Sequence, residues 1–225
     1  MTTLIKNIGL YQNGKVTENQ NISLDGKYIK DFPENPKDEN YAEVIDGKGM
    51  LAMPGLVNTH THVAMTLFRS YADDMELMDW LQNKIWPAED HLDDDIVYWG
   101  SMLAFAEMIR GGTTAFCDMY MFMDSCAQAA DKAGIRGNLA RGLAGISPNA
   151  QSGLQENIEL FEKWEGAGDG RFHVMLGPHA PYTCPPDYIR QVRDEAMKHG
   201  IPIHIHLSET CLLYTSPSPR DTERS

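Results

Sequence analysis

Apolar and polar residues alternate in short runs over residues 1–53, which is typical of strands with one buried face. Two Asp-Gly pairs, Asp25-Gly26 and Asp46-Gly47, interrupt these runs. Asp-Gly between alternating apolar positions favours a two-residue hairpin turn, because both residues tolerate a positive φ. This part of the chain is therefore expected to form a small β unit with hairpins at these pairs.

After Pro54-Gly55 the pattern changes to short apolar runs that alternate with longer amphipathic stretches. Residues 93–112 open with aspartates and have a basic residue and glycines at their end, which is the polarity expected of a helix. Residues 185–200 open with prolines and end on basic residues and a glycine in the same way. The strand candidates around these helices are 56–63, 113–119, 136–143, 172–180 and 201–209.

Strands that alternate with helices predict a parallel α/β sheet or barrel. A closed barrel of this kind has eight strands, whereas an open doubly wound sheet can have about five. The strand candidates therefore fit either an open sheet or the first part of a barrel, and only the motifs can decide between them.

The composition limits the class of protein. With 225 residues, 42% of them hydrophobic, the chain is long enough for one large domain or two small ones. A formal charge of −13 argues against a nucleic-acid-binding surface, which needs clustered cations. The 4 cysteines form no Cys-x-x-Cys pair, which favours reduced thiols. The chain has neither a secretion signal nor an apolar run near about 20 residues, so we expect a cytoplasmic protein without membrane partners.

Histidines are paired on two of the predicted strands. His60 and His62 are two residues apart, so their imidazoles point to the same face of the first strand. His204 and His206 repeat this spacing on the last strand. Sites on parallel sheets lie at the carboxyl ends of the strands, which favours a functional role for His206 and a core position for His204. A His-x-His motif alone equally fits histidines without any such role.

Three histidines from two of the predicted strands suggest a metal site. His60, His62 and His206 suit Zn²⁺ or a similar divalent ion, which activates a bound water molecule. Glu209 follows His206 by three residues, where its carboxylate can carry protons to a leaving group. The pattern therefore predicts hydrolytic chemistry.

The chain resembles the amidohydrolase superfamily, and within it the 5′-methylthioadenosine/S-adenosylhomocysteine deaminases. The resemblance is carried by residues 54–89, by "GPHAPYTC" and by "HIHLSET", and it extends over residues 1–210. It implies an α/β fold of the (β/α)8 TIM-barrel type, with strands one to five in residues 54–210 and part of a small β-sandwich in residues 1–53. It also implies one zinc ion per subunit on the three histidines.

The resemblance assigns roles to further residues. Glu89 would hold the ribose hydroxyls, Arg141 would meet the amino-acid end of the substrate, His179 would contact the nucleoside, and Glu209 would be the proton shuttle. Taken singly, Glu89 also fits a solvated loop residue, Arg141 a surface ion-pair partner and His179 a turn histidine. Three aspartates are expected to be structural, namely Asp73, Asp74 and Asp118.

The end of the chain departs from the family pattern. Family members carry a further active-site histidine on strand six and a metal-binding aspartate on strand eight, and residues after Thr210 supply neither. Residues 211–225, "CLLYTSPSPRDTERS", read as the translation of a sequencing-library adapter. We therefore expect a non-native tail there, and an inactive fragment of a longer parent enzyme.

The expected parent is a metal-dependent hydrolytic deaminase that acts on the adenine ring of methylthioadenosine or adenosylhomocysteine. Its partner would be this small purine nucleoside, and the chain could form a homo-oligomer. Two alternatives stay open: a related guanine deaminase or triazine or chlorotriazine hydrolase, and a non-catalytic metal-binding fragment. Glu89 and Arg141 favour a substrate with a ribose and a carboxylate, which triazines lack.

Overall fold

The computed structural model describes residues 2–207 and 209. The chain divides into two compact units, the first ending at Gly55 and the second beginning at Leu56. The predicted adapter-derived tail, residues 211–225, lies outside the described residues. In the part of the chain that is described, no helix has both the length and the apolar character needed to cross a bilayer.

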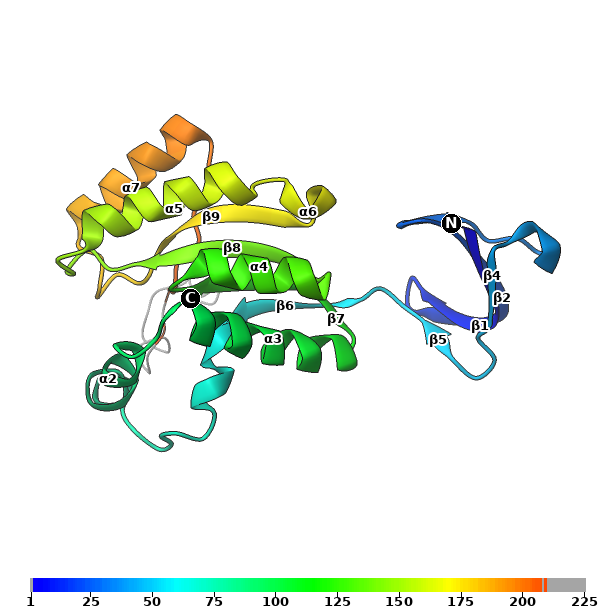
Figure 1. The fold of residues 1–225 in the computed structure, drawn as a ribbon, viewed down its shortest axis with the longest axis horizontal. Helices are drawn as coiled ribbons and strands as arrows, with labels where there is room; N and C mark the ends of the chain where they lie inside the picture. The colour runs from blue at the N-terminus through cyan, green and yellow to red at the C-terminus, as the bar shows by residue number, and fades with distance from the viewer. Residues whose placement is uncertain (1, 208, 210–225) are drawn as a thin grey trace, which may run out of the picture. The chain divides into compact units, whose positions relative to one another are not determined.

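The first unit is a small β-sheet (Figure 1). Its strands are β1 (Thr2–Gln12), β2 (Lys15–Asp25), β3 (Tyr28–Asp31), β4 (Glu43–Asp46) and β5 (Leu51–Ala52), with a short 3₁₀ turn η1 at Asp38–Asn40. The order is β3-β2-β1-β4, and β5 also pairs with β1. Leu4, Ile8 and Ile22 are buried in this unit. The sandwich expected here stays a prediction.

The hairpin at Asp25-Gly26 is confirmed, because β2 and β3 pair antiparallel across it. The hairpin at Asp46-Gly47 is wrong, since β4 and β5 each pair in parallel with β1 and not with each other. A Cβ at Gly47 would lie 2.9 Å from the Cβ of Ile8, so glycine allows a close approach to β1 here. The hairpin between β1 and β2 turns at Asn13-Gly14, which both have positive φ.

The second unit is an α/β structure with a parallel sheet, as predicted. Its strands are β6 (Leu56–Thr61), β7 (Thr113–Tyr120), β8 (Arg136–Leu143) and β9 (Phe172–Pro178), in that order and all parallel. The larger helices are α3 (Asp94–Arg110), α4 (Met123–Ala133), α5 (Ala150–Trp164) and α7 (Pro186–His199). The shorter helical elements are η2 (Val63–Phe68), α1 (Leu77–Trp80), η3 (Leu81–Ile85), α2 (Trp86–Glu89) and α6 (Ala167–Gly170).

The predicted fifth strand, residues 201–209, is only partly formed as a strand. Ile203 makes one isolated parallel bridge to Leu176 of β9. The backbone N–H of Leu176 donates to Pro202, and that of His204 donates back to Leu176. This extended segment therefore follows β9, which brings His206 to the end of the sheet where β6 also ends.

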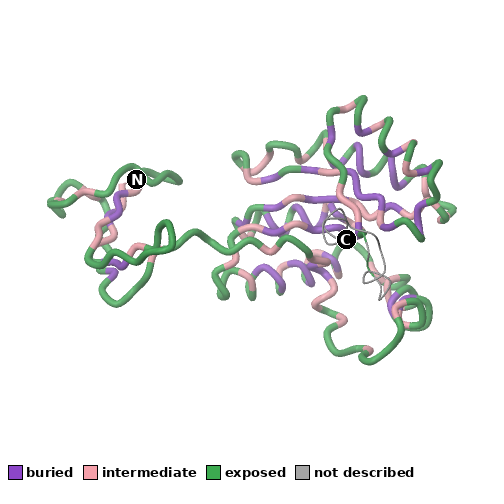
Figure 2. Tube along the Cα trace, turned by 180° about the vertical axis from the view of Figure 1, so that it is seen from behind, coloured by how far each residue is buried: buried purple, intermediate pink, exposed green. Residues whose placement is uncertain are grey.

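The core of the second unit lies between the sheet and the helices that connect its strands. Buried residues run along β7, β8 and β9 (Figure 2). Phe105 of α3 packs on Phe116 of β7 with ring centroids 4.8 Å apart. Leu139 and Phe172 extend this cluster across β8 and β9. This packed layer fixes the strand ends that carry the histidines.

Replacing Asp93 with alanine should destabilise the second unit by about 0.5–2 kcal/mol, because Asp93 caps α3. Its carboxylate accepts a hydrogen bond of 2.8 Å from the backbone N–H of Ile96. Thermal or urea unfolding measures this loss. Asp95→Ala is the matched control, since Asp95 is an exposed acidic residue of the same first turn. Equal losses in the two variants would contradict the capping role.

Candidate active site

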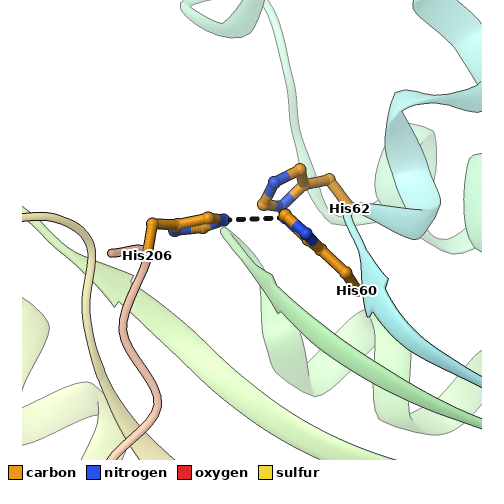
Figure 3. Close-up of side chains that lie close together, drawn as sticks. All are labelled: His60, His62 and His206. Atoms are coloured by element: carbon orange, nitrogen blue, oxygen red, sulfur yellow. Dashed lines mark hydrogen bonds between the residues drawn. The ribbon is translucent and has the colours of Figure 1, made fainter. Parts of the chain in front are cut away.

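Three histidine side chains meet at the ends of β6 and of the segment after β9 (Figure 3). His60 lies in β6, His62 directly follows this strand, and His206 comes from the extended segment 201–207. One ring nitrogen from each of the three lies within 4.8 Å of the others. The Nε2 atoms of His60 and His206 are 3.1 Å apart. The two predicted strands thus bring these imidazoles together.

Backbone carbonyls orient two of the three rings. Nδ1 of His62 lies 2.6 Å from the carbonyl oxygen of Met119, and Nδ1 of His206 lies 3.0 Å from that of His179. A carbonyl oxygen only accepts, so each Nδ1 carries the proton and donates it. The Nε2 lone pairs of His62 and His206 therefore point into the cluster and are free to bind a metal. This is a tautomer that metal-ligating histidines adopt.

The donor set fits a divalent metal ion. Zinc–nitrogen bonds of about 2.0–2.1 Å at tetrahedral angles place two ligand nitrogens about 3.4 Å apart. The separation of 3.1 Å between His60 and His206 is close to this value. Burial, and then the neighbouring imidazoles, lower the pKa of His62 to about 4 despite the opposing Met119 carbonyl. A neutral imidazole is the form that binds a metal.

A cavity of about 600 Å³ opens beside the histidines, and His62 lines it. Much of its wall is apolar and comes from several separate elements, with the side chains of Met65, Trp80, Leu81, Ile85, Trp86, Met121, Leu143 and Ile146. Polar side chains stand between these apolar ones, and such a mixed wall is typical of a pocket for a small molecule. The predicted site residues Glu89, Arg141, His179 and Glu209 all line this cavity.

Glu89 ends α2 and reaches the cavity from the long connection between β6 and β7. The hydroxyl of Tyr120, at the end of β7, donates to its Oε1 over 2.7 Å. Burial raises the pKa of Glu89, while the Tyr120 hydroxyl opposes this rise. Glu89 is therefore a half-buried carboxylate that a hydrogen bond from Tyr120 holds in place, and not a solvated loop residue.

His179 and Glu209 lie on the same side of the cavity. Nδ1 of His179 is 2.9 Å from the hydroxyl of Thr183, and its ring centroid is 5.0 Å from that of His206. Burial, and then His206, lower the pKa of His179, although Glu209 raises it. The carboxylate of Glu209 accepts a hydrogen bond of 2.8 Å from the Tyr182 hydroxyl.

Arg141 stands at the end of β8, between the cavity and the surface. Its Nε donates to the carboxylate of Glu156 over 3.0 Å, and an Nη donates to the carbonyl of Gly142. The arginine pairs with an exposed glutamate, as a surface ion-pair partner would, and it also lines the cavity. A ligand carboxylate would meet a guanidinium that is already oriented.

The residues that the sequence predicted to be structural do not line the cavity. Asp73 and Asp74 are exposed in the connection after η2. His204 is half-buried, with its Nδ1 3.7 Å from Sγ of Cys117, so it is less deeply enclosed than a core residue. Asp118 is fully buried at the end of β7, and burial raises the pKa of its carboxyl to about 7.

Comparison with known proteins identifies the family. The sequence profile of the amidohydrolase family matches residues 51–216. The chain belongs to the amidohydrolase family. A 5-methylthioadenosine/S-adenosylhomocysteine deaminase of Dictyoglomus turgidum is 47% identical over 212 residues, covering 94% of this chain and 50% of the relative. A deaminase of the same name from Desulforudis audaxviator is 55% identical over 168 residues, covering 75% and 39%.

Solved structures of other enzymes share the fold of this amidohydrolase chain. An adenosine deaminase from Xanthomonas campestris, crystallised with bound zinc, is 30% identical with a TM-score of 0.84, over 93% of this chain and 50% of that one. A triazine hydrolase from Arthrobacter aurescens, 20% identical, shares the fold with a TM-score of 0.80, over 99% and 57%. The chain spans about half the length of the curated relatives it matches.

Several functional contacts of this amidohydrolase were not predicted from the sequence. The hydroxyls of Tyr120 and Tyr182 hold the carboxylates of Glu89 and Glu209, and the carbonyl of Met119 orients His62. Tyr182 stands in the motif "GPHAPYTC", which could have suggested its role. The Met119 contact uses a backbone atom, so no pattern of side chains in the sequence predicts it.

Proposed function

We propose that the protein is a zinc-dependent hydrolytic deaminase of adenine nucleosides, with methylthioadenosine and adenosylhomocysteine as its substrates. The observation that carries the proposal is the cluster of His60, His62 and His206 beside a cavity that also holds Glu89 and Glu209. The names of the relatives, and the zinc in the adenosine deaminase structure, support the same reading. In this proposal the chain supplies the first five strand-helix units of a (β/α)8 barrel.

The three imidazoles hold the metal, which when bound activates a water molecule for attack on carbon. The chain's own residues handle the substrate and the protons. Glu209 takes a proton released by the attacking water and delivers it to N1 of the adenine ring. It then takes the second water proton from the new hydroxyl at C6 and delivers it to the departing amino group, so that water and an adenine nucleoside become ammonia and an inosine-type product. Tyr182 holds the Glu209 carboxylate during these transfers.

The remaining cavity residues bind the nucleoside. The apolar wall suits the purine ring and the methylthio group, because it removes apolar area from water. The Glu89 carboxylate can accept two hydroxyl donors of a ribose, and Tyr120 keeps it in place. His179 can contact the purine through its ring, which Thr183 orients.

A substrate panel tests the proposal. Ammonia release is measured from methylthioadenosine, adenosylhomocysteine, adenosine, guanine and a chlorotriazine, with zinc present. The assay uses the protein extended to the length of its relatives, beside the chain of 225 residues. We expect turnover of the adenine nucleosides by the extended protein. Turnover of guanine or the triazine alone would overturn the substrate assignment in favour of the related hydrolases.

Replacing Arg141 with alanine should weaken turnover of adenosylhomocysteine and leave that of methylthioadenosine nearly unchanged. A guanidinium that meets a carboxylate contributes about 1.5–3 kcal/mol, or roughly 10- to 150-fold in kcat/KM. Glu156→Gln is the matched control, since it removes the partner of Arg141 and keeps the cation. An equal loss on both substrates in Arg141→Ala would show that the arginine is structural.

A further inference from the structure

We propose that Asp118 is a positioning residue for His62: its buried carboxylate holds both neighbours of this histidine and so fixes where the imidazole stands. The inference deepens the proposed function, because it rests on the metal role of His62. Asp118, which the sequence suggested was structural, then also shapes the metal site.

The contacts of Asp118 fall on both sides of His62. The hydroxyl of Thr61 donates to Oδ1 of Asp118 over 3.0 Å, and the backbone N–H of Val63 donates to the same oxygen over 3.0 Å. The Thr61 hydroxyl also lies 3.0 Å from the carbonyl oxygen of Cys117, the residue before Asp118. One carboxylate oxygen thus ties the end of β6 to the start of η2.

The imidazole of His62 is held by the same stretch of β7. Its Nδ1 donates to the carbonyl of Met119, the residue after Asp118. The backbone of His62, with φ −131° and ψ 78°, belongs to neither the strand before it nor the 3₁₀ turn after it. The carbonyl of His62 accepts the first 3₁₀ bond of η2, from the N–H of Met65 over 2.9 Å. The Asp118 carboxylate holds the residues on both sides of His62, and the Met119 carbonyl holds its ring.

The chemistry of the contact argues for more than packing. Asp118 is fully buried, and among the described residues its hydrogen-bond donors, on Thr61, Val63, Cys126 and the Met119 backbone, are all neutral groups. Burying a carboxylate without a cation is costly, and an apolar residue would fill the same space at lower cost. An acceptor at this position is useful because it joins two segments that carry a metal ligand between them.

The test compares four variants of the whole chain. Asp118→Ala removes the acceptor, Asp118→Asn keeps an acceptor oxygen of the same shape, and Thr61→Val removes one of the two donors to Oδ1. Cys126→Ala is the matched control, because Cys126 is buried against the other oxygen, Oδ2, at 3.6 Å. Zinc affinity is measured by calorimetric titration, and proton–nitrogen correlation NMR of the metal-free chain reports which ring nitrogen of His62 carries the proton.

We expect Asp118→Ala to lower zinc affinity by about 10- to 100-fold, which is the usual effect of losing a residue that orients a ligand. Thr61→Val should lower zinc affinity less than Asp118→Ala does. The zinc affinities of Asp118→Asn and Cys126→Ala should stay within a few-fold of that of the parent chain. In the NMR spectra of the metal-free chain, the proton of His62 should sit on Nδ1, and Asp118→Ala should give a mixture of tautomers.

Two results would overturn the inference. One is wild-type zinc affinity and an unchanged His62 tautomer in both Asp118→Ala and Thr61→Val. The other is a loss in Cys126→Ala as large as that in Asp118→Ala, which would mean that any defect in this part of the core disturbs the site. A parent chain that binds no zinc would instead contradict the metal assignment, while the tautomer of His62 would still decide whether Asp118 positions it.

Discussion

Glu209→Gln should remove turnover by about 10²- to 10⁴-fold while the protein keeps its metal, because the amide cannot take up and return a proton. The side chain keeps its size, and its oxygen still accepts from Tyr182, which donates to the carboxylate over 2.8 Å. Binding of the nucleoside should therefore change little. Ammonia release by the protein extended to the length of its relatives, under saturating substrate, measures kcat, and metal analysis of the purified protein measures the zinc content.

Tyr182→Phe is the control for this variant. It removes the hydroxyl that holds Glu209 and leaves the carboxylate in place, so we expect a smaller loss of turnover than in Glu209→Gln. If Glu209→Gln turns over substrate at the wild-type rate, the proton shuttle is another residue. If it loses zinc together with activity, Glu209 belongs to the metal site and not to proton transfer.

The position of the histidine cluster could be predicted because it depends on two simple regularities. A spacing of two on a strand sends His60 and His62 to one face, and parallel strands place their carboxyl ends at one edge. Both regularities are local or topological, and neither requires knowledge of side-chain packing. In the structure, one ring nitrogen from each of the three histidines lies within 4.8 Å of the others, as these regularities predict.

Other features depend on contacts between distant segments, and the sequence does not announce them. The Asp46-Gly47 pair looks like a hairpin, yet its glycine is needed where the backbone passes close to Ile8. Glu89 reaches the cavity from a connection whose path is set by packing, and its partner Tyr120 lies 31 residues away. The core position expected of His204 is another such case, because this residue is half-buried beside Cys117.

His206→Ala should abolish tight zinc binding. Loss of a residue that only orients a ligand costs about 10- to 100-fold in affinity, so loss of a ligand itself should cost more than about 100-fold. His204→Ala is the matched control, because His204 lies two residues earlier and contacts Cys117. Calorimetric titration with zinc should find the parent affinity, within a few-fold, in His204→Ala and little binding in His206→Ala.

The fold should survive this substitution, which separates a lost ligand from a lost structure. His206→Ala gives up the bond from Nδ1 to the carbonyl of His179 and the contact of Nε2 with His60, and each such bond contributes about 0.5–1.5 kcal/mol to stability. The backbone bond from the N–H of His206 to the same carbonyl does not need the side chain. Thermal unfolding without metal should therefore stay cooperative, with a midpoint lowered by only a few degrees. Equal zinc affinity in His206→Ala and the parent chain would contradict the three-histidine site, and with it the hydrolytic mechanism built on that site.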